Sequence, residues 1–282
     1  MDLKNKFTGE YIAKGPLALA LERSYECHIL SQQVFERPIL DIGCGDGVFA
    51  SILFKDNKID TGIDVDQKEL ISAGCYGIYE ELIACNAQKI PKKDKTYRTV
   101  FANSAIEHIE DIKGVLQEAR RIMVDNGRMY ITVPTDRFDR YTLIYQMLSS
   151  LRLRTLAENF RILFNRFWKH YHYYDRAGWE GIFTKNGFKI VQYREYNPKF
   201  NCLLNDALVP LSIGSFLSRK FLNRWFVFPH LRRFYTPALD ALFSPMVDQG
   251  LAIKKQGGLI FFELRKVIFL RKSGHKEEMV LI

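Results

Sequence analysis

The 282-residue sequence predicts an α/β fold in which helical insertions cap one edge of a sheet. The first observation is that residues 38–134 alternate short apolar runs with amphipathic stretches, a pattern typical of repeated strand–helix units and a parallel sheet. The second is that 47% of the residues are hydrophobic, which suffices for one large core. Nine prolines and 18 glycines are ordinary usage, which excludes collagen-like and low-complexity structure.

Seven apolar runs are expected to be strands, five in the alternating region and two after it. The expected strands are Pro38–Ile42, Ile59–Ile63, Glu81–Cys85, Thr99–Asn103, Arg128–Val133, Phe188–Tyr193 and Leu259–Leu264. The expected helices are Leu17–Ser24, Val48–Phe54, Ile112–Val124 and Ala177–Asn186, and Asn126-Gly127 and Gly187 are the stop signals of the last two. This order predicts one Rossmann-like, doubly wound sheet of seven strands.

The predicted organisation divides the chain into six parts. Residues 1–36 form an N-terminal helical cap, and residues 37–134 form the Rossmann-like core. Residues 135–176 and 197–256 are insertions, rich in basic and aromatic residues, that cap the carboxyl edge of the sheet. Residues 177–196 return to the core as a helix and a strand, and residues 257–282 supply the last strand and a tail.

Cysteine usage and the absence of targeting patterns indicate the compartment. The five cysteines are odd in number, scattered and without a C-x-x-C pair, which argues against a disulfide framework or zinc ribbon and favours a reducing compartment. The N-terminus has no secretory pattern, and no apolar stretch reaches the roughly 18 to 20 residues that span a bilayer. We therefore expect a cytoplasmic protein that is soluble or, at most, bound to a membrane surface.

The sharpest motif is the segment ILDIGCGDG at residues 39–47, where a buried strand runs into a glycine-rich turn and then a helix. Such a turn lets a ligand approach the backbone, and the helix N-terminus favours an anionic group. Asp64 ends the next strand at a spacing that suits a carboxylate binding ribose hydroxyls, so an adenosine-containing ligand is expected. The spacing is G-x-G-x-G rather than the dinucleotide G-x-G-x-x-G, and Asp41 would repel a pyrophosphate but suit an amino group. These features favour S-adenosylmethionine (SAM) over NAD.

Five segments together resemble the class I SAM-dependent methyltransferases. They are ILDIGCGDG at 39–47, GID at 62–64, CNA with IP at 85–91, NSAIEHI at 103–109, and the helix and turn that contain Glu118, Arg120, Arg121 and Asn126-Gly127. The resemblance covers residues 37–134 and extends loosely to W-x-x-x-F-x-x-x-G-F within 179–193. Arg98 and Asp125-Asn126-Gly127 depart from the family pattern, away from the expected cofactor. The resemblance implies a mostly parallel sheet whose last strand is antiparallel.

The resemblance also implies a cofactor site. Asp41, Gly43 and Gly45 would hold the methionine end, with Asp41 on its amino group, and Cys44 would be a small packing residue of the same loop. Asp64 would bind the ribose and Val65 would pack on the adenine. Asn86, at a position where aspartate is usual, and Ala87 would meet the adenine edge, and Asn103 would close the pocket through its backbone carbonyl. Arg23 could reach the cofactor carboxylate, but a solvated helix face is the favoured interpretation.

Three histidines are candidates for a general base, which a hydroxyl acceptor would need. His108 follows the fourth strand, near the expected methyl group, and a role in fixing the loop is an equally weighted alternative. His170 and His172 lie in the first insertion and are weaker candidates. Their H-Y-H spacing is too short to chelate a metal without a third ligand, so no metal site is expected.

The two insertions contain the excess positive charge of the chain. Residues 136–176 have a net charge of +4 and residues 197–256 one of +5, which together equal the net charge of +9. On one helix over 216–228, Leu217, Phe221, Trp225 and Phe228 would share a face, with Arg219 and Asn223 opposite. A similar stripe of Ile144, Met147, Leu148 and Leu151 is expected within Tyr141–Phe164. The insertions could cap the sheet, dock on a membrane or bind nucleic acid, in decreasing order of preference.

The sequence thus predicts a SAM-dependent methyltransferase whose acceptor is a hydroxyl of a small-molecule, glycan or lipid-linked compound. A basic lid would favour an anionic acceptor such as a sugar phosphate or lipid phosphate. The alternatives are an RNA methyltransferase, for which no recognised RNA-binding module is present, and a SAM-binding regulator without turnover. The oligomeric state stays open.

Overall fold

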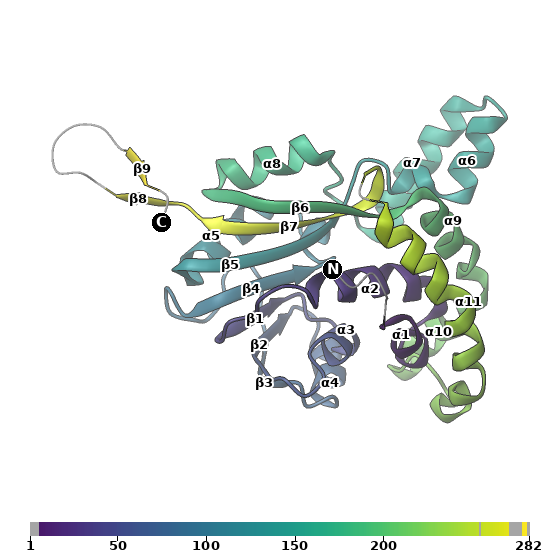
Figure 1. Ribbon diagram of the computed structural model, residues 1–282, viewed down its shortest axis with the longest axis horizontal. Coiled ribbons are helices and arrows are strands. Elements are labelled where there is room, and N and C mark those ends of the chain that lie inside the picture. The colour runs from purple at the N-terminus through teal and green to yellow at the C-terminus, as the bar shows by residue number, and fades with distance from the viewer. Residues whose placement is uncertain (1–5, 254, 271–277, 281–282) are drawn as a thin grey trace.

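The computed structural model describes residues 6–253, 255–270 and 278–280. Seven strands form one sheet: β1 (Ile39–Ile42), β2 (Ile59–Asp64), β3 (Tyr79–Ala84), β4 (Tyr97–Asn103), β5 (Met123–Pro134), β6 (Phe188–Pro198) and β7 (Gly257–Lys266). Their order is β3-β2-β1-β4-β5-β7-β6, and β7 is antiparallel to both neighbours. The predicted doubly wound, mostly parallel seven-stranded sheet with an antiparallel last strand is confirmed (Figure 1).

Helices cover both faces of the sheet. One face packs against α1 (Thr8–Lys14), α2 (Leu17–Leu30), α3 (Val48–Leu53) and α11 (Arg232–Ala252). The other face packs against α5 (Ile112–Ile122) and α8 (Arg176–Lys185). The helix α4 (Gln67–Gly74) lies beside β2 and β3. Eleven of the 14 residues of α2 are buried, so this helix belongs to the core rather than to a separate N-terminal cap.

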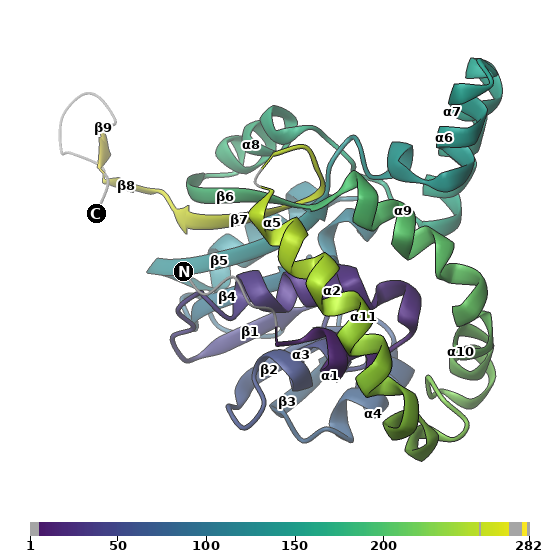
Figure 2. The ribbon, with the colours of Figure 1, turned by 45° about the vertical axis from the view of Figure 1, so that its right-hand side comes forward.

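The first insertion and the beginning of the second lie beyond the carboxyl edge of the sheet, whereas α11 returns over one face. The first contains the short 3-10 helix η2 (Asp139–Tyr141), α6 (Leu143–Ser150) and α7 (Arg154–Trp168). The second contains α9 (Lys199–Ala207), α10 (Val209–Leu222), η3 (Pro229–Leu231) and α11. Figure 2 shows α9 and α10 descending along one side of the molecule, while α11 crosses in front of α2. A short hairpin of β8 (Ile268–Leu270) and β9 (Glu278–Val280) follows the last core strand.

Three expected elements differ from the structure. The helix α5 ends at Ile122 because β5 begins at Met123, so Asn126-Gly127 lies in a strand and does not terminate a helix. The predicted helix over 216–228 ends at Leu222, because Asn223 takes a left-handed conformation with φ of 54°. The stretch Tyr141–Phe164 divides between η2, α6 and α7, with Arg152 in a left-handed turn between the last two.

Among the described helices, none is both long and apolar enough to cross a membrane by itself. The pair α9 and α10 meets that criterion only when the two are taken together, and they are bent by 60° at their junction.

Candidate functional site

The glycine-rich turn after β1 forms one wall of the site. Gly43, Gly45 and Gly47 have positive φ angles of 73°, 52° and 77°, which residues with a side chain rarely adopt. A Cβ on Gly43 would lie 2.6 Å from the Cβ of Ala105, so this position has no room for a side chain. The turn therefore presents bare backbone at the carboxyl ends of the parallel strands, which is where open α/β sheets bind ligands.

Asp64 connects this turn to the next strand. Its carboxylate accepts hydrogen bonds from the backbone N–H groups of Gly45 (3.0 Å) and Asp66 (2.9 Å). Asp64 also lines a cavity of about 610 Å³ at the same edge of the sheet. The carboxylate is thus held by the backbone at the position where the sequence predicts the ribose.

Five of the predicted cofactor residues line this cavity, which is called the cofactor cavity below. They are Gly43, Asp64, Val65, Asn86 and Ala87. Val65 is 74% exposed, so its apolar side chain is accessible to an adenine ring. The side-chain oxygen of Asn86 accepts a hydrogen bond from the N–H of Gln88. The bare turn, the fixed carboxylate and the exposed apolar side chain together fit an adenosine-containing ligand.

Four predicted residues do not line the cofactor cavity. Asp41 faces the other side of β1, where its buried carboxylate accepts a hydrogen bond of 2.7 Å from the Tyr79 hydroxyl. Cys44 is buried within the turn, and Gly45 belongs to the same turn without lining the cavity. Asn103, expected to close the pocket through its backbone carbonyl, is not among the lining residues, and its side chain donates to Glu26. The structure therefore does not bring Asp41 to the position expected for a methionine amino group.

A second cavity, of about 250 Å³, lies under the insertions and is called the cap cavity below. Its walls come from α2, the segment after β4, the end of β5, η2, α7, α9, α10 and β7. The lining is mainly apolar and aromatic, and includes Phe138, Tyr141, Phe164, Trp168, Val209, Phe216 and Leu259. Ser104 and His108 line both cavities, so the two compartments meet at the segment after β4.

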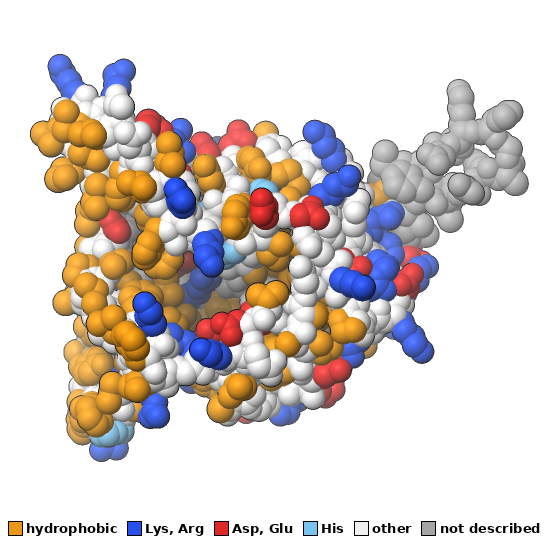
Figure 3. Space-filling model, turned by 180° about the vertical axis from the view of Figure 1, so that it is seen from behind, with side chains coloured by type: hydrophobic (Ala, Val, Ile, Leu, Met, Phe, Trp, Pro, Cys, Tyr) orange, Lys and Arg blue, Asp and Glu red, His pale blue; other side chains and the backbone are white. Residues whose placement is uncertain are grey.

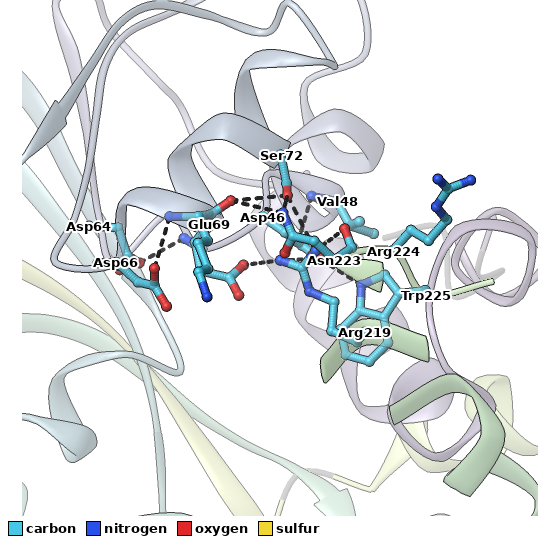
Figure 4. A network of polar contacts seen from close by, with 12 residues as sticks. Asp46, Val48, Asp64, Asp66, Glu69, Ser72, Arg219, Asn223, Arg224 and Trp225 are labelled. Carbon is cyan, nitrogen blue, oxygen red and sulfur yellow. Dashed lines mark hydrogen bonds and ion pairs between the residues drawn. The ribbon is translucent and has the colours of Figure 1, made fainter. Parts of the chain in front are cut away.

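Polar contacts connect the second insertion to the glycine-rich turn and to α4 (Figure 4). The indole N–H of Trp225 donates a hydrogen bond of 2.6 Å to Asp46, which belongs to that turn. Arg219 pairs with Glu69 of α4 and lies near Ser72, with only 12% of its side chain exposed. Trp225 therefore does not share a membrane-facing stripe, and Arg219 does not point to solvent as the helical pattern predicted.

The comparisons with known proteins agree with this geometry. The sequence profile of a methyltransferase domain family matches residues 17–193, which is more than half of the chain. The chain belongs to this methyltransferase family. It is a class I SAM-dependent methyltransferase, as the glycine-rich turn and the sheet order indicate.

Several methyltransferases of known name resemble parts of this chain. The ubiquinone biosynthesis O-methyltransferase of Yersinia enterocolitica is 23% identical over 35% of this chain and 43% of its own length. The sterol 24-C-methyltransferase ERG6B of Gibberella zeae is 28% identical over 40% of this chain and 33% of its own length. This chain thus matches less than half the length of these two curated relatives.

Solved structures share the fold of this methyltransferase at low sequence identity. A SAM-dependent methyltransferase from Thermotoga maritima, described as a possible histamine N-methyltransferase, has a TM-score of 0.54 and 15% identity, covering 89% of this chain and 91% of its own. A phosphoethanolamine N-methyltransferase from Haemonchus contortus, in complex with S-adenosylhomocysteine, has a TM-score of 0.51 and 18% identity. It covers 92% of this chain and 56% of its own.

His108 stands at the boundary of the two cavities of the methyltransferase. Its Nδ1 lies 3.3 Å from the carbonyl oxygen of Lys169, and because a carbonyl only accepts, this nitrogen carries the proton. The other nitrogen, Nε2, is then the basic one. Burial lowers the pKa of His108 below its usual value, which keeps the ring neutral near pH 7. A neutral imidazole whose Nε2 carries no proton is the form that can accept one, and this nitrogen lies 3.9 Å from Oε1 of Glu107.

The two candidate histidines of the first insertion, His170 and His172, have environments that differ from each other. His170 lines the cap cavity, and its ring centroid lies 5.0 Å from that of His108. Burial, with a smaller contribution from His108, lowers the pKa of His170 to about 3. His172 lines neither cavity. Its Nε2 is 3.0 Å from the carbonyl oxygens of both Ile109 and Glu110. The structure therefore gives His172 a role in holding the first insertion against the loop after β4.

Sequence patterns did not reveal the buried charges at the inner end of the cap cavity. Arg23 of α2 lies between two glutamates, at 2.6 Å from Glu26 and 3.7 Å from Glu22, and its side chain is only 18% exposed. Its assignment to a solvated helix face is therefore wrong. Glu107 completes the group, and burial raises its pKa to about 8. The segment NSAIEHI contains Glu107, but nothing in its local pattern indicates burial.

The raised pKa of Glu107 predicts how the stability of the methyltransferase depends on pH. The folded protein holds a proton on Glu107 that the unfolded chain releases above pH 4.5, so stability falls as the pH rises from 4.5 to about 8. The loss from this group is about 1.4 kcal/mol for each pH unit. Asp41 and Glu22, each with a pKa raised by burial to about 7, act in the same direction at lower pH. Of these three carboxyl groups, Glu107 therefore contributes the largest share of the slope between pH 7 and 8.

We expect Glu107→Gln to reduce this slope in urea unfolding measured between pH 7 and 8. Glu110→Gln is the matched control, because Glu110 lies three residues away and is exposed. A variant at Glu107 with the same pH dependence as the wild type would contradict the assignment.

Proposed function

We propose that this methyltransferase transfers the methyl group of SAM to a hydroxyl group of an apolar small molecule or lipid-linked acceptor held in the cap cavity. The observation that supports the proposal is the meeting of the two cavities at Ser104 and His108. A donor in one cavity and an acceptor in the other would be brought together beside a neutral imidazole.

The lining of the cap cavity supports an apolar acceptor. Aromatic and aliphatic side chains dominate its walls, which favours a ring or a chain over a glycan rich in hydroxyl groups. Its acidic and basic members other than histidine are Glu22, Arg23, Glu107 and Asp206, and burial raises the pKa of both glutamates. A single arginine among three acids does not favour an anionic group inside. The basic residues of the insertions lie mostly outside this cavity. The names of the relatives, which concern ubiquinone biosynthesis and a sterol, also support an apolar acceptor.

The chemistry assigned to this chain is positioning and proton removal. When bound, SAM supplies a methyl group on a sulfonium, whose sulfur is a good leaving group. Holding the acceptor oxygen in line with that methyl group contributes through effective molarity. His108 accepts the hydroxyl proton on Nε2 as the new carbon–oxygen bond forms, while the carbonyl of Lys169 fixes the ring orientation.

Thermal unfolding with SAM, S-adenosylhomocysteine and NADH, followed by an acceptor screen, tests this function. A ligand at about 100 times its Kd adds roughly 2.7 kcal/mol of stability, and each kcal/mol raises the Tm by about 2–4 °C for a chain of this size. We expect such a rise with the two adenosyl ligands and none with NADH. Methyl transfer is then measured to phenolic and aliphatic alcohols of graded length. Transfer to an amine but not to any alcohol would overturn the assigned acceptor atom.

A further inference from the structure

The outer faces of the two insertions are unusually apolar. More than two thirds of the exposed large hydrophobic side chains among the described residues lie within 143–168 and 200–242. Five of them are phenylalanines, Phe167, Phe200, Phe221, Phe228 and Phe234, which are 58–76% exposed. Figure 3 shows hydrophobic side chains gathered along the edge of the molecule that carries α6, α7 and α10. An exposed surface of this extent indicates an interaction site.

Basic side chains surround this surface, which is called the cap face below. Near α6 and α7 they are Arg152, Arg154, Arg166 and Lys169, and near α10 and α11 they are Lys220, Arg224 and Arg233, all exposed. Lys220 lies over the ring of Phe221 and Arg233 over that of Phe234, at 5.8 and 4.9 Å from the ring centroids. The exposed acid of α7, Glu158, is already paired with Arg161 at 2.5 Å. The cap face therefore combines apolar side chains with unneutralised positive charge.

We infer that the cap face docks on an anionic lipid membrane. Phenylalanines and leucines would enter the interface, while the surrounding lysines and arginines contact lipid phosphates. A second copy of this chain is disfavoured as the occupant, because it would bring two sets of the same positive charges together. Docking goes beyond the proposed function and does not depend on which acceptor atom is methylated.

The helices α7 and α10 separate the cap cavity from the cap face. Phe164 and Trp168 of α7 line the cavity from inside, while Leu163 and Phe167 of the same helix are exposed on the cap face. On α10, Phe216 likewise lines the cavity, while Leu217 and Phe221 are exposed. The rings of Trp168 and Phe216 are 6.5 Å apart and bridge the two helices. A membrane under the cap face would place lipid next to the wall of the acceptor compartment.

Vesicle flotation tests docking without any activity measurement. We expect the 282-residue chain to bind vesicles of phosphatidylcholine with about 30% phosphatidylglycerol and to bind phosphatidylcholine alone poorly. Binding should be lost as salt rises from about 0.1 M to about 0.5 M. Phe221→Ser with Phe228→Ser should lower the partition coefficient at least tenfold. Lys220→Gln with Arg224→Gln should lower it about fivefold for each charge, since each cation near an anionic surface contributes about 1 kcal/mol.

The matched control is Val34→Ser with Val191→Ser, which removes two exposed apolar side chains that lie outside the cap face, on a loop before β1 and on the edge strand β6. Every variant must keep the Tm rise with S-adenosylhomocysteine, which shows that it is folded. Equal partitioning of the phenylalanine variant and the wild type would overturn the inference. The inference would also be overturned if the wild type sediments as a stable dimer and the phenylalanine variant alone sediments as a monomer. The cap face would then be a protein interface.

Discussion

Replacing Asp64 by alanine is expected to abolish the Tm rise that SAM produces in the wild-type protein. The carboxylate lines the cofactor cavity and accepts two backbone hydrogen bonds, from Gly45 and Asp66. Hydrogen bonds to a charged group contribute about 1.5–3 kcal/mol each, so losing two ribose contacts would raise the Kd by about 10²–10⁴. Release of Gly45 would also loosen the turn that forms the wall of the cavity. Isothermal titration with SAM and S-adenosylhomocysteine measures the change directly.

Asp66→Ala is the control that separates binding from stability. Asp66 is the next acid in the chain, but its side chain caps α4 by accepting from the N–H of Lys68 at 2.8 Å, and it does not line the cavity. Removing such a cap costs about 1 kcal/mol of stability. We therefore expect Asp66→Ala to lower the Tm without changing the Kd for SAM. If Asp64→Ala binds SAM as tightly as the wild type, the assignment of the ribose to Asp64 is wrong.

The core of the fold could be predicted because its signals are local. Most of the buried strands are short runs rich in apolar residues, and the glycine-rich turn at 43–47 needs a left-handed backbone that glycine adopts without strain. Asp41 shows the limit of such reasoning. It lies next to the turn in sequence, but alternation along β1 places its side chain on the same face as Ile39, where Tyr79 binds it.

The insertions were predicted less well, because contacts distant in sequence decide their structure. The apolar spacing continues from Phe221 to Trp225, yet the helix stops at Asn223 and Trp225 bonds to Asp46, 179 residues away in sequence. Arg219 has the pattern of a solvent-facing residue, but Glu69 and Ser72 lie in reach only after α4 and α10 meet. The cap cavity is missed for the same reason, since elements from separate parts of the chain, from α2 to β7, form its walls.

Replacing His108 by glutamine is expected to lower kcat by about 10²–10⁴ while SAM binding is retained. The reason is that Nε2 is the basic nitrogen of a neutral ring at the boundary of the two cavities, and glutamine cannot accept the hydroxyl proton. The wild-type pH profile of kcat should rise with pH through a value below 6.5, because burial lowers the pKa of His108 and only the neutral ring is active. That acid limb should be absent in the variant.

Two further variants separate a general base from a histidine that only holds the loop. His170→Gln tests the second candidate, whose Nδ1 lies 3.2 Å from the side-chain oxygen of Asn165. His230→Gln changes an exposed histidine on η3 and should leave kcat and the pH profile unchanged. A structural role for His108 would lower the Tm and raise KM, and the acid limb would persist. Loss of kcat together with loss of the acid limb is the combination that only proton transfer to His108 explains, because alignment of the reactants alone has no titrating group.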